Sequence, residues 1–210
     1  MCLCIYAFCI LHSKMKQFIP ILLFWLLWIP SYSQDEASQA ILARREKVNK
    51  EFQDSNTSPL DPGDKKKFEG LNYFSIDPGY RLTARFVRTE KPVIFKMKMT
   101  ASPRMEYTTV GYVVFDLQGI GYKLMAYKKP ETEAAYFIPF SDATNGKETY
   151  ESGRYVDFPV PSNEDVILDF NGAYNPYCAY SRRFSCPIPP PENKVTVAIR
   201  AGEKKFKESH

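Results

Sequence analysis

The spacing of apolar residues predicts one helix near the start of the chain and strands beyond it. Over residues 35–53, apolar side chains recur at intervals of four and seven, which places them on one face of an α-helix. These positions are Ala37, Ile41, Val48 and Phe52. Residues 54–64 are rich in Asn, Ser, Pro and Gly, so we expect the helix to end near residue 53.

From residue 73 onward, apolar and polar residues alternate with a period of two, the pattern of strands that bury one face. Leu82, Ala84 and Phe86 show it in one segment, and Phe95 and Met97 in the next. The predicted strands are 80–87, 93–99, 107–117, 119–127, 134–140, 154–160, 165–170 and 194–201. Between the first two, the Thr-Glu-Lys-Pro at 89–92 predicts a hairpin turn.

Many short strands at close spacing predict a mainly β fold. We expect an antiparallel β-sandwich or barrel-like domain with an N-terminal α-helix. The helix would cover about 35–53 and the β-rich core about 71–203.

Residues 169–193 interrupt this pattern, because they follow neither a helical nor a strand period. They are rich in aromatic residues, which favours burial over disorder. Prolines at 187, 189, 190 and 191 stiffen the end of the segment in an extended path. We therefore expect an ordered loop that crosses one end or one face of the sheet.

The first 33 residues are typical of a secretory signal peptide. An apolar run at 18–30 follows Lys14 and Lys16, and Ser31 and Ser33 supply the small residues before a cut after Ser33. An uncleaved anchor is the alternative, although the run is shorter than the roughly 20 residues of a spanning helix. Met15 is an alternative start. The prediction is one domain, 34–210, exported to the periplasm or secreted, without stable membrane insertion after cleavage.

Composition and charge limit the partners that we expect and predict the state of the two remaining cysteines. The net charge of +4 includes Lys14 and Lys16, and no basic stripe is present, so we expect no nucleic-acid partner. The residue directly after the cut is Gln34 and not a cysteine, so no lipid anchor is expected. Cys178 and Cys186 remain in an oxidising compartment, which predicts a disulfide. A metal is the alternative, but His210 is the sole histidine after the cut and cannot complete a zinc site, so we expect no metal and no cofactor.

Three stretches resemble a known family. "FSDATNGKETYESGRYVDF", "LDFNGAYNPYCAYSRRFSCPIPPPENKV" and "IRAGEK" are similar to the signature of the bacterial domain of unknown function 1684 family. The resemblance runs from "SPL" and "KKFEGLNYF" to Glu203. It implies a type of domain and no chemistry, because the family has no established activity.

Polar and aromatic residues in these stretches are the candidate ligand-binding set: Asp142, Arg154, Asn171, Tyr174, Tyr180, Glu192 and Glu203. Arg154 suits an anionic group, and the two tyrosines suit a flat ring. The alternative is structural: turn-forming Asp and Asn, and a buried Arg154 paired with Asp169 or Glu203. A calcium loop around Gly146 is a weaker alternative, because its spacing departs from the helix–loop–helix pattern.

Two functions fit these residues best. The first is non-catalytic binding of a small ligand or an envelope component. The alternative is a hydrolase of glycans or similar polymers that uses Asp142, Asp169, Glu192 or Glu203, two of which would face each other across a cleft at roughly 5–10 Å. Nucleophilic Ser-His or Cys-His pairs are excluded, because no histidine lies within the predicted core. A structural partner in a complex is a third possibility.

Overall fold

The computed structural model describes residues 29–129, 131 and 133–207. The chain divides into two units, Met1–Ala40 and Ile41–His210, and helix α1 (Ile29–Gln53) begins in the first and ends in the second. The helix ends where the sequence predicted and begins earlier. The predicted signal peptide lies mostly outside the described residues and stays a prediction. No helix within the described ranges has the length and apolar character needed to cross a membrane.

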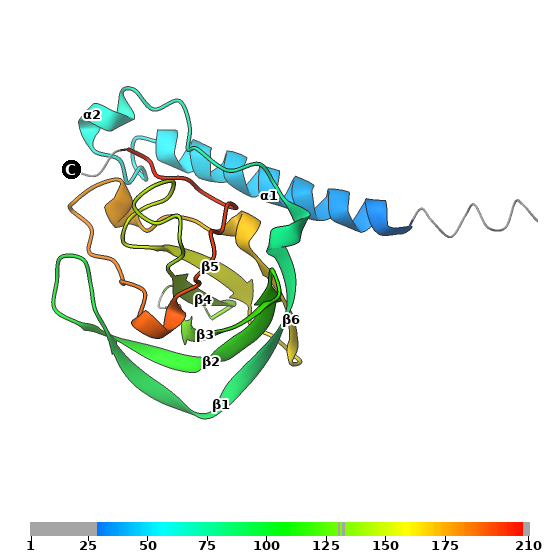
Figure 1. Cartoon of the computed structure of the whole chain (residues 1–210). Helices are drawn as coiled ribbons and strands as arrows, with labels where there is room; N and C mark the ends of the chain where they lie inside the picture. Colours follow the sequence, from blue (N-terminus) through cyan, green and yellow to red (C-terminus); the bar gives the residue numbers. More distant parts are fainter. Residues whose placement is uncertain (1–28, 130, 132, 208–210) are drawn as a thin grey trace, which may run out of the picture. The chain divides into compact units, whose positions relative to one another are not determined.

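The second unit is built on one antiparallel sheet of six strands. The order across the sheet is β5-β4-β3-β2-β1-β6. The strands are β1 (Arg81–Met97), β2 (Met105–Leu117), β3 (Ile120–Lys128), β4 (Ala135–Phe140), β5 (Arg154–Pro159) and β6 (Asp165–Asp169). The sheet curls until its edge strands, β5 and β6, approach each other (Figure 1). The fold is therefore mainly β, as predicted, and it is a nearly closed barrel, one of the two predicted forms.

Strand β1 corrects the predicted turn at 89–92. Both of its halves pair with β2, Arg88 opposite Gly111 and Val93 opposite Thr109, so the intervening residues form a bulge and the strand continues. The buried positions change parity at this point: Ala84 and Phe86, before it, face the barrel interior, whereas Phe95 and Met97, after it, pack in a cluster on the outer face. A bulge produces the same change of phase as a turn, and it accommodates Pro92, which lacks a backbone donor. Val93, at the end of the bulge, is exposed.

The last predicted strand, 194–201, is also corrected. Val195, Ile199 and Ala201 are fully buried in the barrel core, so their alternation is real, but the segment joins no strand of the sheet and pairs by backbone bonds with Ser141 and Ala143. Side chains bond the backbone of its second half. Arg154 donates to the carbonyls of Ile199 and Ala201, and the amide of Ile199 donates to Asp142. The alternation of buried and less buried residues in this segment therefore comes from packing inside the barrel and not from a strand of the sheet.

The sheet carries a hydrophobic cluster on each face. The barrel interior is filled by alternate residues of every strand, such as Phe86, Val113, Leu124 and Phe158. Residues on the opposite face of strands β1 to β5, together with Met99 just after β1, form a second cluster on the outer face. We call it the outer aromatic cluster, and its buried members are Met97, Met99, Tyr107, Tyr127, Phe137 and Tyr155.

The irregular segment 170–193, which we call the cover loop, is ordered and lies over this outer cluster. It contains three short 3-10 helices, η2 (Phe170–Gly172), η3 (Tyr177–Ala179) and η4 (Pro191–Asn193). It is fixed to the sheet by isolated bridges from Tyr174 to Tyr155 and from Pro187 to Met99. This confirms an ordered loop that crosses one face of the sheet.

A third cluster joins the cover loop to the C-terminal part of α1. Phe52 of α1 meets Tyr180 of the loop edge-on, with ring centroids 4.8 Å apart. Leu60 and Leu71 complete the cluster, from the connection that holds the short helix α2 (Pro62–Lys65). The 3-10 turn η1 (Pro78–Tyr80) then leads into β1.

Candidate functional site

Arg154 and Asp142 are buried inside the barrel as an ion pair. Arg154 Nη2 donates to Asp142 Oδ2 at 2.9 Å, and both side chains have zero exposure. The guanidinium also donates to the carbonyls of Ile199, Ala201 and Glu203 at 2.6–3.0 Å. Burial lowers the pKa of Arg154, and Asp142 opposes that shift. The structural interpretation of Arg154 is therefore right, but its predicted partners, Asp169 and Glu203, are wrong as carboxylate partners.

Asp142 has no oxygen left for a ligand. Its Oδ1 accepts from the amide and hydroxyl of Thr144 and from the amide of Ile199, while Oδ2 receives Arg154. The stretch around Gly146 is a tight turn closed by such bonds, for example from Gly146 N to the carbonyl of Thr149 at 3.0 Å. Across the described residues, no three His, Cys, Asp or Glu side chains gather closely enough to hold a metal ion.

Glu203 is buried at the other end of the same network. Its carboxylate accepts from the amide of Asn175 at 3.0 Å, from Asn175 Nδ2 at 2.9 Å and from the hydroxyl of Tyr180. Burial raises the pKa of Glu203 to about 7, against the opposing effect of these donors. Two residues of the predicted set, Tyr180 and Glu203, are thus brought together, and their polar groups bond each other, so both are 2% exposed although they line the cleft described below.

Asn171 is likewise structural. Its Oδ1 accepts from the amide of Asp77 at 2.9 Å, and its Nδ2 donates to the carbonyl of Asp77 at 2.8 Å and to Asp169 at 2.9 Å. This amide therefore acts as a backbone-like partner for the turn before β1. Asp169 also pairs with Arg81 at 3.5 Å, and Glu192 is exposed on η4, away from the other predicted residues.

Four predicted residues line one cleft, and Tyr174 is the part-exposed one, whereas Asn171, Tyr180 and Glu203 are buried there. Its hydroxyl donates to Asp157 at 2.8 Å and accepts from Lys129 at 3.1 Å, while Lys129 also pairs with Asp157 at 2.7 Å. The guanidinium of Arg44 lies 5.4 Å from the Tyr174 ring centroid. Burial first, and then the charge of Asp157, raise the pKa of Tyr174 well above its ordinary value. Its hydroxyl therefore remains a proton donor at any physiological pH.

The space beside Tyr174 is a cleft of about 630 Å³, which we call the aromatic cleft. The outer aromatic cluster forms its floor, and α1 and the cover loop form its sides. Ile41, Val48 and Phe52 line it from α1, and Tyr174, Tyr177 and Phe184 line it from the cover loop. Arg44, Lys129 and Tyr174 place polar groups in this wall, and Arg45, Glu51 and Glu131 are further charged residues that line it.

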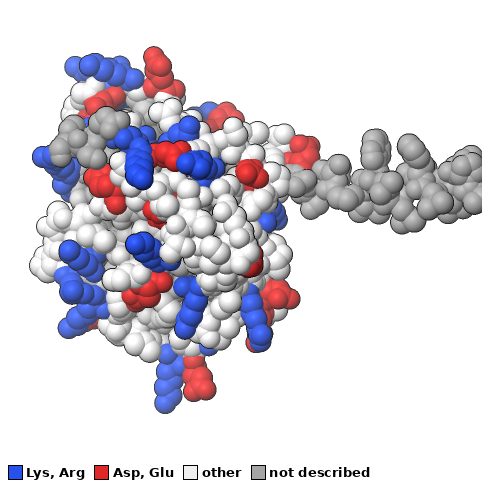
Figure 2. All heavy atoms as spheres, viewed as in Figure 1, with Lys and Arg blue, Asp and Glu red and all other residues white. Residues whose placement is uncertain are grey.

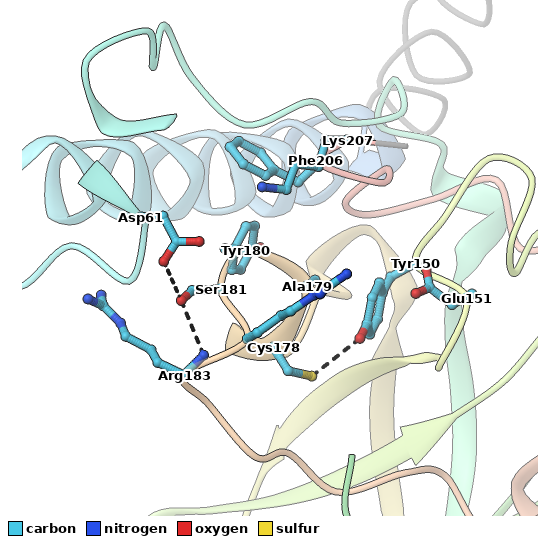
Figure 3. Close-up of a pocket in the computed structure, with 11 residues that line it drawn as sticks. Asp61, Tyr150, Glu151, Cys178, Ala179, Tyr180, Ser181, Arg183, Phe206 and Lys207 are labelled. Atoms are coloured by element: carbon cyan, nitrogen blue, oxygen red, sulfur yellow. Dashed lines mark hydrogen bonds between the residues drawn. The ribbon is translucent and has the colours of Figure 1, made fainter. Parts of the chain in front are cut away.

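A second hollow of about 510 Å³, the cysteine hollow, is also lined by the cover loop. Figure 3 shows the Cys178 sulfur beside the Tyr150 hydroxyl, which donates to it at 3.5 Å. The same view shows Asp61 accepting from Ser181, at 2.6 Å. Arg182, Arg183 and Lys207 add positive charge to the walls.

The predicted disulfide is not formed in the structure, where Cys178 and Cys186 are both free thiols. They are nevertheless neighbours, because the amide of Cys178 donates to the Cys186 sulfur at 3.2 Å. Cys186 is buried and lines the aromatic cleft, whereas Cys178 lines the cysteine hollow. Oxidation of the pair in an exported protein stays a prediction.

Most of the aromatic cleft was missed from sequence. Tyr107, Phe137 and Tyr155 look like ordinary alternating strand residues, and sequence alone does not show that a loop leaves space above them. Lys129 lies in none of the quoted motifs, and Asp157 lies in the first of them but was not chosen as a candidate. One signal in the sequence was usable. Large apolar residues fall on both faces of β4, Phe137 outside and Ile138 inside, which indicates that both faces of the strand are covered.

The fold and its clefts define a small, nearly closed antiparallel barrel with a covered outer face. Residues 66–204 match the family described as "Protein of unknown function (DUF1684)". An uncharacterised protein of Haloarcula marismortui, known from a solution NMR structure, is 34% identical, with a TM-score of 0.68 over 82% of this chain and 96% of that one. The chain therefore belongs to the DUF1684 family, which confirms the resemblance. No protein of curated function matches the chain.

Proposed function

We propose that the protein binds a small, mainly apolar molecule in the aromatic cleft and does not transform it. The observation that carries the proposal is the cleft itself, about 630 Å³ in volume and lined by the aromatic and methionine side chains of the outer face. Ligand sites are concave, mostly apolar and roughly 300–1,000 Å³ in volume. Flat rings or a short hydrocarbon chain would suit walls made of Tyr107, Phe137, Tyr155 and Met99.

The polar group around Tyr174 would orient the ligand. The Tyr174 hydroxyl and Lys129 already share Asp157, so a ligand oxygen would enter this network as a further acceptor. Arg44 is about half exposed beside it and offers a second donor. The preferred ligand would thus have an apolar body and one oxygen-bearing end.

Binding is favoured over hydrolysis because the carboxyls named for hydrolysis are occupied or isolated. Asp142 is held by Arg154 and backbone donors, and Glu203 by Asn175 and Tyr180. Asp169 accepts from Asn171, and Glu192 stands exposed. None of these four faces another across a cleft with a free oxygen.

We further propose that the protein is exported, on the strength of the signal-like residues 1–33. An envelope component with an apolar body would then be a natural ligand. Basic and acidic side chains are interspersed on the face shown in Figure 2, a surface that does not select for polyanions. Expression in a bacterial host followed by mass measurement tests export: a periplasmic product starting at Gln34 supports it, and an intact cytoplasmic chain contradicts it.

The binding test is fluorescence of anilinonaphthalene sulfonate with the purified protein, followed by displacement with a panel of fatty acids, quinones and aromatic acids. Met105 lines the cleft and is 48% exposed, so Met105→Trp would obstruct the cleft without disturbing the core. Ile167→Trp, at an exposed position on β6, is the matched control.

Saturable binding that Met105→Trp weakens at least about tenfold, with Ile167→Trp unchanged, would support the cleft as the site. Equal binding by both variants would place the probe elsewhere and refute the proposal.

A further inference from the structure

The two cysteines are placed asymmetrically on one short segment of the cover loop. Cys178 is part-exposed and lines the cysteine hollow, whereas Cys186 is 7% exposed and faces the aromatic cleft. Their contact is direct, since the Cys178 amide lies 3.2 Å from the Cys186 sulfur. A reagent that enters the cysteine hollow therefore meets Cys178 first, and Cys186 stands behind it.

The surroundings of Cys178 favour its thiolate. The Cys186 thiol is the strongest of its hydrogen-bond partners, and the Tyr150 hydroxyl and Thr100 add further bonds. Together they lower the pKa of Cys178 to about 7 in spite of burial. The same pairing, with burial, raises the pKa of Cys186. A thiolate is the nucleophile in disulfide chemistry, so Cys178 is suited to attack first and Cys186 to react second.

The walls of the hollow indicate the charge of a reagent. Arg182 is exposed, Arg183 is anchored through the carbonyl of Ser58 at 2.9 Å, and Lys207 reaches Asp64 at 2.7 Å. On the acidic side, Asp61 already accepts from Ser181. Glu151 also lines the hollow, so three basic and two acidic residues surround it, and this small positive excess favours a reagent that carries carboxylates.

We propose that Cys178 and Cys186 form a dithiol site that exchanges with small disulfides bearing carboxylates, with Cys178 as the attacking and Cys186 as the resolving residue. The Cys178 thiolate attacks one sulfur of the small disulfide. A bond forms between Cys178 and that sulfur, the disulfide bond of the reagent breaks, and the departing thiolate leaves with the electron pair and takes a proton from water.

Cys186 completes the exchange. It releases its proton to water and attacks the Cys178 sulfur, which forms the Cys178–Cys186 bond and expels the second small thiolate. The protein dithiol is oxidised by two electrons, and the small disulfide is reduced to two thiols. The site is separate from the aromatic cleft proposed for ligand binding, although Cys186 lies between the two.

The first test incubates the reduced protein with glutathione disulfide, which carries carboxylates, and with cystamine, which carries only amines, and follows the products by mass. Wild-type protein should give an internal disulfide without a lasting adduct. Cys186→Ser should accumulate one glutathione adduct on Cys178, and Cys178→Ser should react at least about tenfold more slowly. An Arg182→Ala variant should lose preference for glutathione disulfide over cystamine.

The second test uses Tyr150→Phe, which removes the hydrogen bond to Cys178, against Tyr122→Phe, whose hydroxyl bonds Thr196 at 2.8 Å. If the Cys178 pKa rises by one unit, exchange at pH 7 slows about two- to fivefold. At high pH, where Cys178 is a thiolate in both proteins, Tyr150→Phe should react faster than the wild type. The reason is that a thiolate with a higher pKa is the stronger nucleophile. Tyr122→Phe should follow the wild-type profile.

A third measurement needs no variant: brief alkylation of the reduced wild-type protein at pH 7, followed by peptide mapping, should label Cys178 well before Cys186. Equal labelling of both cysteines, faster labelling of Cys186, or reaction with glutathione disulfide no faster than that of an unfolded cysteine peptide would each overturn the proposal. A stable double adduct on the wild-type protein would also overturn it, because it would show that Cys186 does not resolve.

Discussion

Arg154 Nη2 and Asp142 Oδ2 lie 2.9 Å apart inside the barrel, with both side chains completely enclosed. The pair does more than neutralise charge. Arg154 reaches from β5 to three carbonyls of the C-terminal segment, and Asp142 receives the amide of Ile199 from the same segment. These two side chains thereby add to the backbone bonds that the segment makes with Ser141, Ala143 and Ala173.

Removal of either partner should be costly, because the other charge would remain buried and unpaired. We expect Arg154→Met and Asp142→Asn each to lower the free energy of unfolding by about 3–5 kcal/mol. Urea unfolding monitored by circular dichroism measures this. The exposed pair of Arg85 and Glu164, 2.6 Å apart, is the control, and Arg85→Met there should cost no more than about 1 kcal/mol. Similar losses at both sites would contradict the role of burial.

Glu203 should make stability fall as pH rises. Its folded-state pKa, about 7, lies above the ordinary value of 4.5, so the folded protein holds the proton more tightly than the unfolded chain. The stabilisation is complete below pH 4.5 and is lost as pH rises to about 7. Within this window the difference in unfolding free energy between wild type and Glu203→Gln should change by up to about 1.4 kcal/mol per pH unit.

Chemical denaturation at a series of pH values gives this difference. Glu192→Gln, at an exposed carboxyl, is the matched control and should leave the pH dependence as in the wild type. A constant difference between wild type and Glu203→Gln from pH 4.5 to 7 would show that Glu203 is ionised throughout.

Gly202 should tolerate no side chain. Its φ is +75°, and an added Cβ would lie 2.5 Å from the carbonyl oxygen of Ala173. Strain and overlap together should make Gly202→Ala destabilising by at least about 2 kcal/mol. Gly121→Ala, where nothing lies within 4 Å of the added Cβ, should change stability far less. Thermal unfolding of the two variants makes the comparison, and equal midpoints would refute the steric argument.

Tyr174 should contribute more to ligand binding than to folding. Tyr174→Phe removes one donor to Asp157, which keeps Lys129 at 2.7 Å, so the stability cost should be about 1 kcal/mol or less. A ligand oxygen that accepts from this group would lose about fivefold in affinity. Titration of any ligand found by the displacement screen measures this. Tyr80→Phe, which frees the carbonyl of Ala198, should leave affinity unchanged.

The period of apolar residues predicted strands correctly where the alternation of buried and exposed residues comes from pairing in a sheet. It placed the end of α1 at Gln53 and located six real strands. It failed at 89–92 and at 194–201, because a bulge shifts the phase as a turn does, and because a segment inside a barrel alternates as a strand does. Both failures concern pairing partners, which a one-dimensional pattern does not record.

The candidate residues were chosen for polarity in an unusual segment, and that criterion does not separate ligand contacts from internal ones. Arg154, Asn171 and Glu203 proved to be buried partners of backbone groups, whereas Tyr174 borders the cleft. Asp142 was missed as the partner of Arg154 because the two are brought together by the pairing of β4 with β5, which sets Arg154 opposite Phe140. The residues that line the cleft could not be predicted from the sequence either, because they depend on where the cover loop leaves space.

The position of the C-terminal segment sets the order in which this chain can mature on the ribosome. Val195, Ile199 and Ala201 have no exposed surface, and Arg154 finds its carbonyl partners at residues 199, 201 and 203. All six strands are synthesised before those partners exist. Until residues 199–203 have been synthesised, the Arg154 guanidinium has Asp142 as a partner and lacks these three carbonyls. The core is therefore completed only when the C-terminal segment has been added.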